Sequence, residues 1–91
     1  MSSVEVVKQS DLDWIEKFFE PAPRYRGRNP KAMNITAYRG KHILEHHRAE
    51  RYMSSEEFER CMEHLGINVF RGTGYYPIRL RKEYGELWRC M

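Results

Sequence analysis

The sequence contains no long apolar run, and only two of its 91 residues are cysteine. A helix that crosses a bilayer needs about 20 consecutive apolar residues, so no membrane-spanning segment and no membrane partner are predicted. Nothing at the start of the chain has the pattern of a secretory signal. Cys61 and Cys90 are too few for the disulfide framework of a small secreted domain. We therefore expect a cytoplasmic protein.

Recognisable catalytic signatures are also missing. No Gly-rich phosphate loop and no Ser-His-Asp or Cys-His set can be identified, and Gly72 and Gly74 are better explained by a turn. The His-Ile-Leu-Glu-His segment that begins at His42 matches a short zinc-protease pattern, but no acidic ligand accompanies it downstream. We expect no enzymatic activity and no cofactor.

A structural zinc site is the remaining metal hypothesis, with His42, His46, Cys61 and His64 as its four ligands. Such a site requires the Cys61 thiol to meet two histidines that point away from the apolar side of their own helix. A thiol buried in an apolar stripe is the favoured interpretation, and no bound metal is predicted.

The clearest structural signal lies between Tyr52 and Leu80. Ser54 followed by Glu57 is a capping box, which predicts the start of a helix. Apolar residues then recur with helical spacing, at Phe58, Cys61, Met62 and Leu65. Gly66 predicts the end of the helix, because glycine takes the left-handed conformation after a helix without a steric penalty. The pattern predicts a helix over 55–65.

Two short β-rich runs follow, at 67–70 and 75–80, with a glycine-bearing turn between them. This arrangement predicts a β-hairpin. Pro77 has no N–H group to donate to a neighbouring strand, so its strand is predicted to lie at the edge of a sheet.

Two further helices are predicted before this stretch. Ser10 can cap a helix from 11 to about 19, with Pro21 beyond its end. Its buried stripe would consist of Leu12, Ile15 and Phe19, with Trp14 and Phe18 at the margin. A second helix over about 36–48 places one set of side chains inward, at Ala37, Gly40, Ile43, Leu44 and His47. Gly40 in that set predicts the close approach of a neighbouring helix.

The two ends of the chain carry weaker patterns. A short N-terminal strand that pairs with the hairpin is predicted from Val4, Val6 and Val7. The final residues have large apolar side chains with helical spacing, at Tyr84, Leu87 and Trp88. This last segment predicts either a short helix that docks on the core or the contact of a homodimer, and both alternatives stay open.

A capped helix that ends at glycine and leads into a hairpin resembles the second half of a winged helix-turn-helix module. The segment from Tyr52 to Ile67, with its arginine and glycine turn, is similar to the small winged-helix domain near the C-termini of phage and plasmid primase-helicases. Tyr38-Arg39-Gly40-Lys41-His42 is similar to an element of very small phage proteins. The resemblance covers about 36–82.

This resemblance implies an α+β fold, a small winged helix-turn-helix with three main helices and a C-terminal β-hairpin as the wing. The predicted N-terminal strand would join the hairpin, and 1–91 would be a single domain with a basic loop at 21–34. In that arrangement 36–48 is the first helix and 55–65 the recognition helix. The resemblance also implies a phage-encoded protein that acts in the cytoplasm of a host cell.

Positive charge is concentrated between Pro21 and Asn34, where no acidic residue occurs. The stretch Arg24-Tyr25-Arg26-Gly27-Arg28 resembles flexible basic arms, which bind phosphates and stack on bases. The alternative is a solvated loop between two helices.

The helix over 55–65 is a poor reader of the major groove, because its outward face is mainly acidic and phosphates would repel it. Binding to DNA or RNA is therefore expected through the basic arm, the preceding helix and the wing, at Arg24, Tyr25, Arg26, Arg28, Lys31, Arg39, Lys41, Arg71, Arg79, Arg81 and Lys82. The alternative is a phage-encoded inhibitor or modulator that captures a host protein, for example one of a defence system. Its binding face would be Glu56, Glu59, Arg60 and Glu63.

Overall fold

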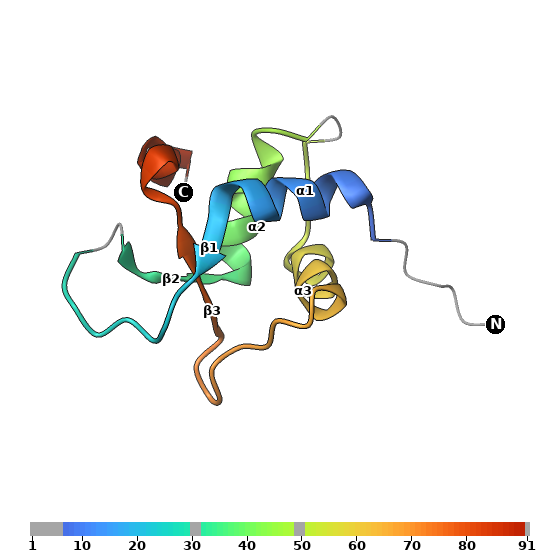
Figure 1. Cartoon of the computed structure of the whole chain (residues 1–91). Coiled ribbons are helices and arrows are strands. Elements are labelled where there is room, and N and C mark those ends of the chain that lie inside the picture. Colours follow the sequence, from blue (N-terminus) through green and yellow to red (C-terminus); the bar gives the residue numbers. More distant parts are fainter. Residues whose placement is uncertain (1–6, 30–31, 49–50, 91) are drawn as a thin grey trace.

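The computed structural model describes residues 7–29, 32–48 and 51–90, and for 88–90 the backbone alone. The elements follow in the order α1 (Gln9–Phe18), β1 (Phe19–Pro21), β2 (Asn34–Thr36), α2 (Ala37–Glu45), α3 (Ser55–His64), β3 (Tyr75–Leu80) and the 3-10 helix η2 (Lys82–Cys90) (Figure 1). The predicted α+β class is confirmed, with three α-helices and a three-stranded antiparallel sheet in the described part. Val4, Val6 and Lys31 lie outside the described residues.

No helix in the described ranges combines the length with the apolar composition that crossing a bilayer requires. The longest α-helices, α1 and α3, have 10 residues each, about half of what a spanning helix needs.

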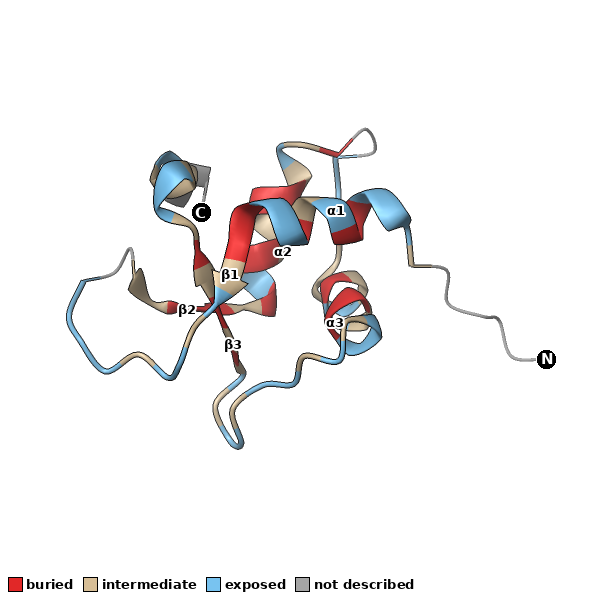
Figure 2. Cartoon of the chain, in the orientation of Figure 1, coloured by how far each residue is buried: buried red, intermediate tan, exposed pale blue. Residues whose placement is uncertain are grey.

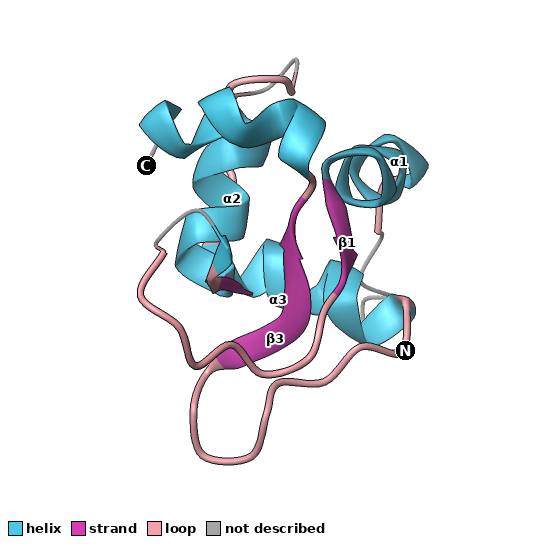
Figure 3. Ribbon diagram, turned by 60° about the vertical axis from the view of Figure 1, so that its left-hand side comes forward, coloured by secondary structure: helices cyan, strands magenta, loops and turns pink. Residues whose placement is uncertain are grey.

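β3 is the central strand of the sheet, in the order β1-β3-β2. In the pairing with β1, Phe19 lies opposite Leu80. In the pairing with β2, Ile35 lies opposite Tyr76. Figure 3 shows β1 and β3 side by side. The strand from the second half of the chain therefore joins two strands from the first half.

The prediction that Pro77 marks an edge strand is wrong. The register of β2 shifts between Asn34 and Ile35, which leaves Pro77 and Ile78 without a partner on that side. A proline within such a bulge removes no hydrogen bond from the sheet. On the other side of β3, the carbonyl of Pro77 accepts a hydrogen bond from the N–H of Ala22 (2.9 Å).

The prediction of a strand at 67–70, the first half of the β-hairpin, is also wrong. Residues 67–70 form no strand, and the N–H of Phe70 donates to the carbonyl of Tyr75 where the two segments meet (2.8 Å). Beyond that point, β1 and Ala22 pair along this edge of β3. The edge that 67–70 needed for a hairpin is therefore occupied by a segment from the start of the chain.

α1 begins earlier than predicted, and Ser10 is not its cap. The N-cap residue is Lys8, whose side chain makes no capping hydrogen bond. The helix ends at Phe18 because the backbone becomes extended at Phe19, where β1 starts. Both phenylalanine rings are buried, so the prediction that Phe18 lies at the margin is wrong. The change from helix to strand turns two consecutive rings toward the core.

α3 follows its predicted pattern. The Oγ atom of Ser54 accepts a hydrogen bond from the N–H of Glu57 (3.1 Å), and the N–H of Ser54 donates to the Glu57 carboxylate (3.2 Å). Gly66 has a φ of 75°. The N–H groups of Gly66 and Ile67 donate to carbonyls of the last helical turn, at 3.0 and 2.9 Å. This Schellman geometry ends the helix as predicted.

The core lies between the sheet and the inward sides of α1, α2 and α3, which are drawn red in Figure 2. The predicted inward face of α2 is confirmed at Ala37, Gly40, Ile43 and Leu44. The helix is shorter than predicted and ends at Glu45. His47 lies in the following turn, where its ring packs 4.7 Å from Phe18 and 5.3 Å from Trp14, measured between ring centroids.

A buried ion pair, not recognised in the sequence, connects α1 with the turn after α2. Arg48 Nε lies 3.2 Å from Asp11 Oδ1, and both side chains are about 95% buried (exposed fractions of 4% and 5%). Arg48 also donates hydrogen bonds to the carbonyl of Tyr52 (2.6 Å) and to Glu57 (3.4 Å). One guanidinium thus joins α1, the backbone at Tyr52 and the first turn of α3.

η2 leads the chain back against the core after β3. The ring of Tyr84 lies edge-on to Phe18, with centroids 5.0 Å apart, and Leu87 packs against the core. Docking of the final segment is confirmed for these two residues. The side chain of Trp88 lies outside the described residues, and the homodimer contact stays a prediction.

Candidate functional site

The basic loop between β1 and β2 is anchored to the sheet by Asn34. The Asn34 carboxamide oxygen accepts a hydrogen bond from the N–H of Tyr25 (2.7 Å). Its NH₂ group donates to the carbonyl of Pro23 (3.1 Å) and to that of Ile78 in β3 (3.4 Å). Because Asn34 is only 5% exposed, losing these bonds would leave buried polar groups unpaired.

The loop also has internal contacts that restrict its shape. The hydroxyl of Tyr25 accepts a hydrogen bond from the N–H of Asn29 (2.5 Å). The Tyr25 ring lies so close over Gly27 that a Cβ atom at this position would overlap it. The structure therefore shows a loop tied to β3 and closed on itself, whereas the alternatives predicted from the sequence were a flexible arm and a solvated loop.

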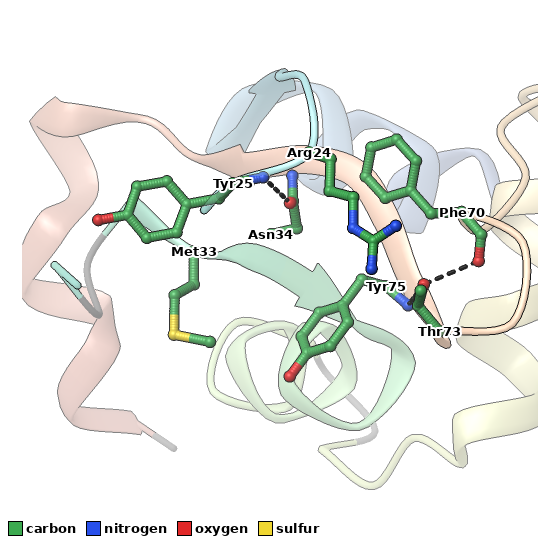
Figure 4. Close-up of a pocket in the computed structure, with 7 residues that line it drawn as sticks. All are labelled: Arg24, Tyr25, Met33, Asn34, Phe70, Thr73 and Tyr75. Atoms are coloured by element: carbon green, nitrogen blue, oxygen red, sulfur yellow. Dashed lines mark hydrogen bonds between the residues drawn. The ribbon is translucent and has the colours of Figure 1, made fainter. Parts of the chain in front are cut away.

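A pocket of about 180 Å³ lies where this loop meets the turn before β3 (Figure 4). From the loop and β2 come Arg24, Tyr25, Met33 and Asn34, and from the turn and β3 come Phe70, Thr73 and Tyr75. In Figure 4 the guanidinium of Arg24 points into the space between Phe70 and Tyr75, and the ring of Tyr25 lies at the other end, beside Met33. Most of the pocket wall is therefore aromatic or apolar, with one cation.

The neutral polar groups of the pocket are used within the protein. Thr73 Oγ1 donates to the carbonyl of Phe70 (2.7 Å) and accepts from the N–H of Tyr75 (3.1 Å). The Asn34 amide is engaged as described above. Arg24 is exposed and forms no hydrogen bond or ion pair with any residue that the structure describes. Its guanidinium is the unoccupied donor of the pocket.

A second hollow, of about 260 Å³, lies at the other end of the basic loop. It is lined by Asn29, Ala32, Arg79, Leu80, Arg81, Lys82 and Gly85. Arg79 is partly neutralised, because its Nε lies 2.7 Å from the carboxylate of Glu20, and Arg81 lies 3.7 Å from the same carboxylate. Lys82 is exposed. Two of the cations predicted to bind phosphate, Arg79 and Arg81, are thus paired with Glu20, which was not recognised in the sequence as their partner.

The remaining predicted basic residues are divided between two places. Arg26 and Arg28 are exposed on the loop, and Arg71 is exposed in the turn next to the pocket residue Phe70. Arg39 and Lys41 lie on α2. The structure therefore brings the arm and the turn together around one pocket, and neither Arg39 nor Lys41 lines it.

Lys41 of α2 is already engaged. Its ammonium lies 3.5 Å from Glu45 and over the exposed rings of Tyr38 and Tyr52, at 5.2 and 5.8 Å from their centroids. Burial alone would raise the pKa of Glu45, but a hydrogen bond from the N–H of Met53 and the positive charge of Lys41 hold the pKa below its usual value. Lys41 is a weaker candidate for phosphate contact than the arginines of the loop.

The acidic face of α3 lies beside Val69 and Tyr76, and its residues do not line the pocket with the basic loop. Glu56, Glu59 and Glu63 are exposed, and Arg60 lies 3.9 Å from Glu56. Burial, with the charges of Glu59 and Glu63 nearby, raises the pKa of Tyr76 to about 12. Tyr75 and Tyr76, adjacent in β3, thus face a basic loop and an acidic helix respectively.

The thiol of Cys61 is buried, as the favoured interpretation predicted (2% exposed). Burial, together with the charge of Asp11, raises the pKa of this thiol to about 11, which keeps it protonated and a poor metal ligand. Within the described ranges no three His, Cys, Asp or Glu side chains are grouped to hold a metal ion. His42 instead contacts Glu45 on its own helix (3.3 Å).

Comparison with family models, with curated proteins and with solved structures finds no match for this chain. The site must be interpreted from its own residues. Sequence reasoning selected Arg24 and Tyr25 but missed Asn34, Phe70 and Tyr75. The two aromatic residues had a detectable signal, because they flank a predicted turn next to Arg71. Asn34 had none, since its partners are distant in the sequence.

Proposed function

We propose that this protein binds nucleic acid through a surface made of the basic loop and the turn before β3, on a small fold of the winged helix-turn-helix type. The observation that carries the proposal is the meeting of Arg24 and Tyr25 with Phe70 and Tyr75 around one pocket. These residues belong to two segments that were selected separately as arm and wing. Their convergence supports one continuous binding surface.

The charge distribution supports the same surface. Arg26, Arg28 and Arg71 are exposed beside the pocket and can neutralise phosphates, whose counterions are released on binding. Aromatic rings next to arginines are the usual composition of surfaces that contact both bases and backbone. The turn takes the part of the wing in this proposal. α3, with its acidic face, is turned away from the ligand.

The test is a titration of labelled DNA and RNA by fluorescence anisotropy at several salt concentrations. Replacing Arg24, Arg26 and Arg28 together by Ala should weaken binding to every sequence. The slope of log K against log salt should decrease by about 0.7 to 0.9 for each phosphate contact that is lost. Lys17→Ala removes one exposed cation of α1 and serves as the control for a single Arg24→Ala change. Wild-type protein that shows no salt-dependent affinity for either nucleic acid at low ionic strength would refute the proposal.

A second candidate function is the capture of a basic protein by α3. A hollow of about 440 Å³ runs between this helix and the segment before the turn, and it combines Glu59 and Glu63 with Val69, which is 40% exposed. Acidic side chains around an exposed apolar residue suit a basic, partly apolar partner. Glu56, Glu59 and Glu63 changed together to Gln should abolish such binding, first by slowing association, and should leave nucleic-acid affinity unchanged or higher.

A further inference from the structure

The pocket between the loop and the turn has the composition of a stacking site. Three aromatic rings and a thioether line a space of about 180 Å³, roughly six times the 30 Å³ that one water molecule occupies in the liquid. The aromatic and apolar part of the wall offers no hydrogen-bond donors to a phosphate, which can pair only with the Arg24 guanidinium on the same pocket. Flat walls of this kind suit a planar ring, because aromatic side chains stack on the faces of bases.

We infer that this pocket receives one unpaired nucleobase, so that the partner is a single strand rather than a duplex; the inference rests on the proposed function. Bases in a duplex are stacked on their neighbours and cannot enter a pocket unless they are first turned out. Unstacked bases of a single strand are free to insert between protein side chains. The pocket therefore selects against paired nucleic acid.

The hydrogen-bonding groups of the pocket indicate a base-tolerant site. Thr73 and Asn34 already bond to the backbone of Phe70, Tyr75, Tyr25 and other neighbours, as described above. Arg24 has a free guanidinium, which can stack on a base or pair with a phosphate next to it. Stacking without a set of directed donors and acceptors discriminates little between bases.

The basic loop provides a path for the backbone of the strand. Arg24 and Tyr25 line the pocket, Asn29 and Ala32 line the second hollow, and the exposed Arg26 and Arg28 lie in the sequence between these ends. Lys82 and the partly neutralised Arg79 and Arg81 complete the second hollow. A strand with one base in the pocket can follow the loop with its phosphates against these cations.

The inference is tested with short labelled oligonucleotides: a single strand, the duplex of the same sequence, and the single strand with abasic sites. DNA and RNA versions of each are compared at one salt concentration. We expect the single strand to bind at least tenfold more tightly than the duplex, and abasic sites to remove most of that difference. Phe70→Leu and Tyr75→Leu keep apolar volume but lose the flat ring, and each should weaken single-strand binding by about 5- to 100-fold.

Two variants serve as controls. Tyr75→Phe retains the ring and should bind more tightly than Tyr75→Leu, which has lost it. Tyr38→Leu removes an exposed tyrosine (62% exposed) of α2 that lies outside the pocket, and it should have no effect. Circular dichroism melts verify that each variant is folded. If Tyr75→Leu unfolds because Tyr75 is part of the sheet, Phe70→Leu, in the turn, decides the test.

The possible failures are distinguishable. If the wild-type protein binds none of the DNA or RNA oligonucleotides, the proposed function itself is overturned. Binding that depends on the loop arginines but is equal or tighter for the duplex leaves the proposed function intact and refutes the single-strand inference. Single-strand binding that is indifferent to abasic sites and to both leucine variants refutes it as well.

Discussion

Gly40 of α2 lies so close to the ring of Phe58 in α3 that a Cβ atom at position 40 would overlap that ring. Phe58 is completely buried and also packs edge-on against Phe19 and Tyr76, with centroids 6.4 and 6.0 Å apart. The ring therefore has neighbours on several sides and cannot move away from α2 without disturbing the sheet.

Gly40→Ala should lower the free energy of unfolding by about 1–3 kcal/mol, because overpacking a tight contact outweighs the better helix propensity of alanine. Urea unfolding measures the change. Gly85→Ala is the matched control, since a Cβ atom at that position meets nothing within 4 Å. Equal stability of the two variants would show that the contact between α2 and α3 is looser than described.

Asn34→Ala should destabilise the protein by about 1–3 kcal/mol, because it leaves the N–H of Tyr25 and the carbonyl of Ile78 without their partner. It should also release the basic loop and so weaken nucleic-acid binding. Hydrogen exchange at the Tyr25 amide reports the release directly. Exchange at that amide as slow as in the wild type would mean that Asn34 does not anchor the loop.

Asp11→Ala should cost about 3–5 kcal/mol of stability, since it removes the buried carboxylate next to the Arg48 guanidinium and leaves that cation with the more exposed Glu57, 3.4 Å away. The loss should be nearly independent of salt, because buried charges are poorly screened. Asp13→Ala, at an exposed position of the same helix, should change stability by less than about 1 kcal/mol. Similar urea midpoints for the two variants would contradict the assignment of Asp11 to the core.

Stability should decrease as the pH falls below about 6.5, in part because of His47. Burial, with the charges of His46 and Lys17, lowers the pKa of His47 from 6.5, and its Nε2 atom is buried without a hydrogen-bond partner among the residues that the structure describes. Between the pKa of His47 in the folded state and 6.5, the unfolded state binds more protons than the folded state. The contribution of neutral His47 to stability is therefore complete above pH 6.5 and is lost as the pH falls toward the folded pKa.

The measurement is a series of urea melts of wild type and His47→Phe from pH 7.5 down to pH 5. Phenylalanine keeps the ring contacts with Trp14 and Phe18 but cannot take up a proton. The variant should therefore show a smaller decrease in stability over this range. An identical pH dependence in both proteins would assign the titration to other groups.

The elements predicted correctly from the sequence are those whose bounds depend on neighbouring residues, and the pairings that were missed depend on distant ones. α3 was predicted almost to the residue, because its start at Ser54 and its end at Gly66 depend on bonds within a few positions. The strand at 75–80 was predicted from the β-rich composition of the run itself. Its partners were not, since β1 and β2 come from the first half of the chain. No pattern near Pro77 could indicate that two segments distant in the sequence pair with the two edges of β3.

The same limit applies to the candidate site. Charge density, with Tyr25 interleaved among the arginines, selected Arg24, Arg26 and Arg28, because such a cluster can be recognised in the sequence. The anchoring of the loop depends on one amide that bonds across 44 positions, from Asn34 to Ile78. Together with the bonds of Asn34 to Tyr25 and Pro23, that bond holds the loop against the sheet. The aromatic wall of the pocket at Phe70 and Tyr75 could be located only once the loop was known to reach it.

The position of β3 has a consequence for how the molecule assembles. Both of its partner strands precede it in the sequence, with α2 and α3 between β2 and β3. Closing such long loops is slow compared with forming helices. During synthesis the three helices can form while the loop has nothing to bind, and the pocket appears in a late step, when β3 leaves the ribosome and enters between its neighbours. A nascent chain that stops before Tyr75 should be helical and unable to hold a ligand.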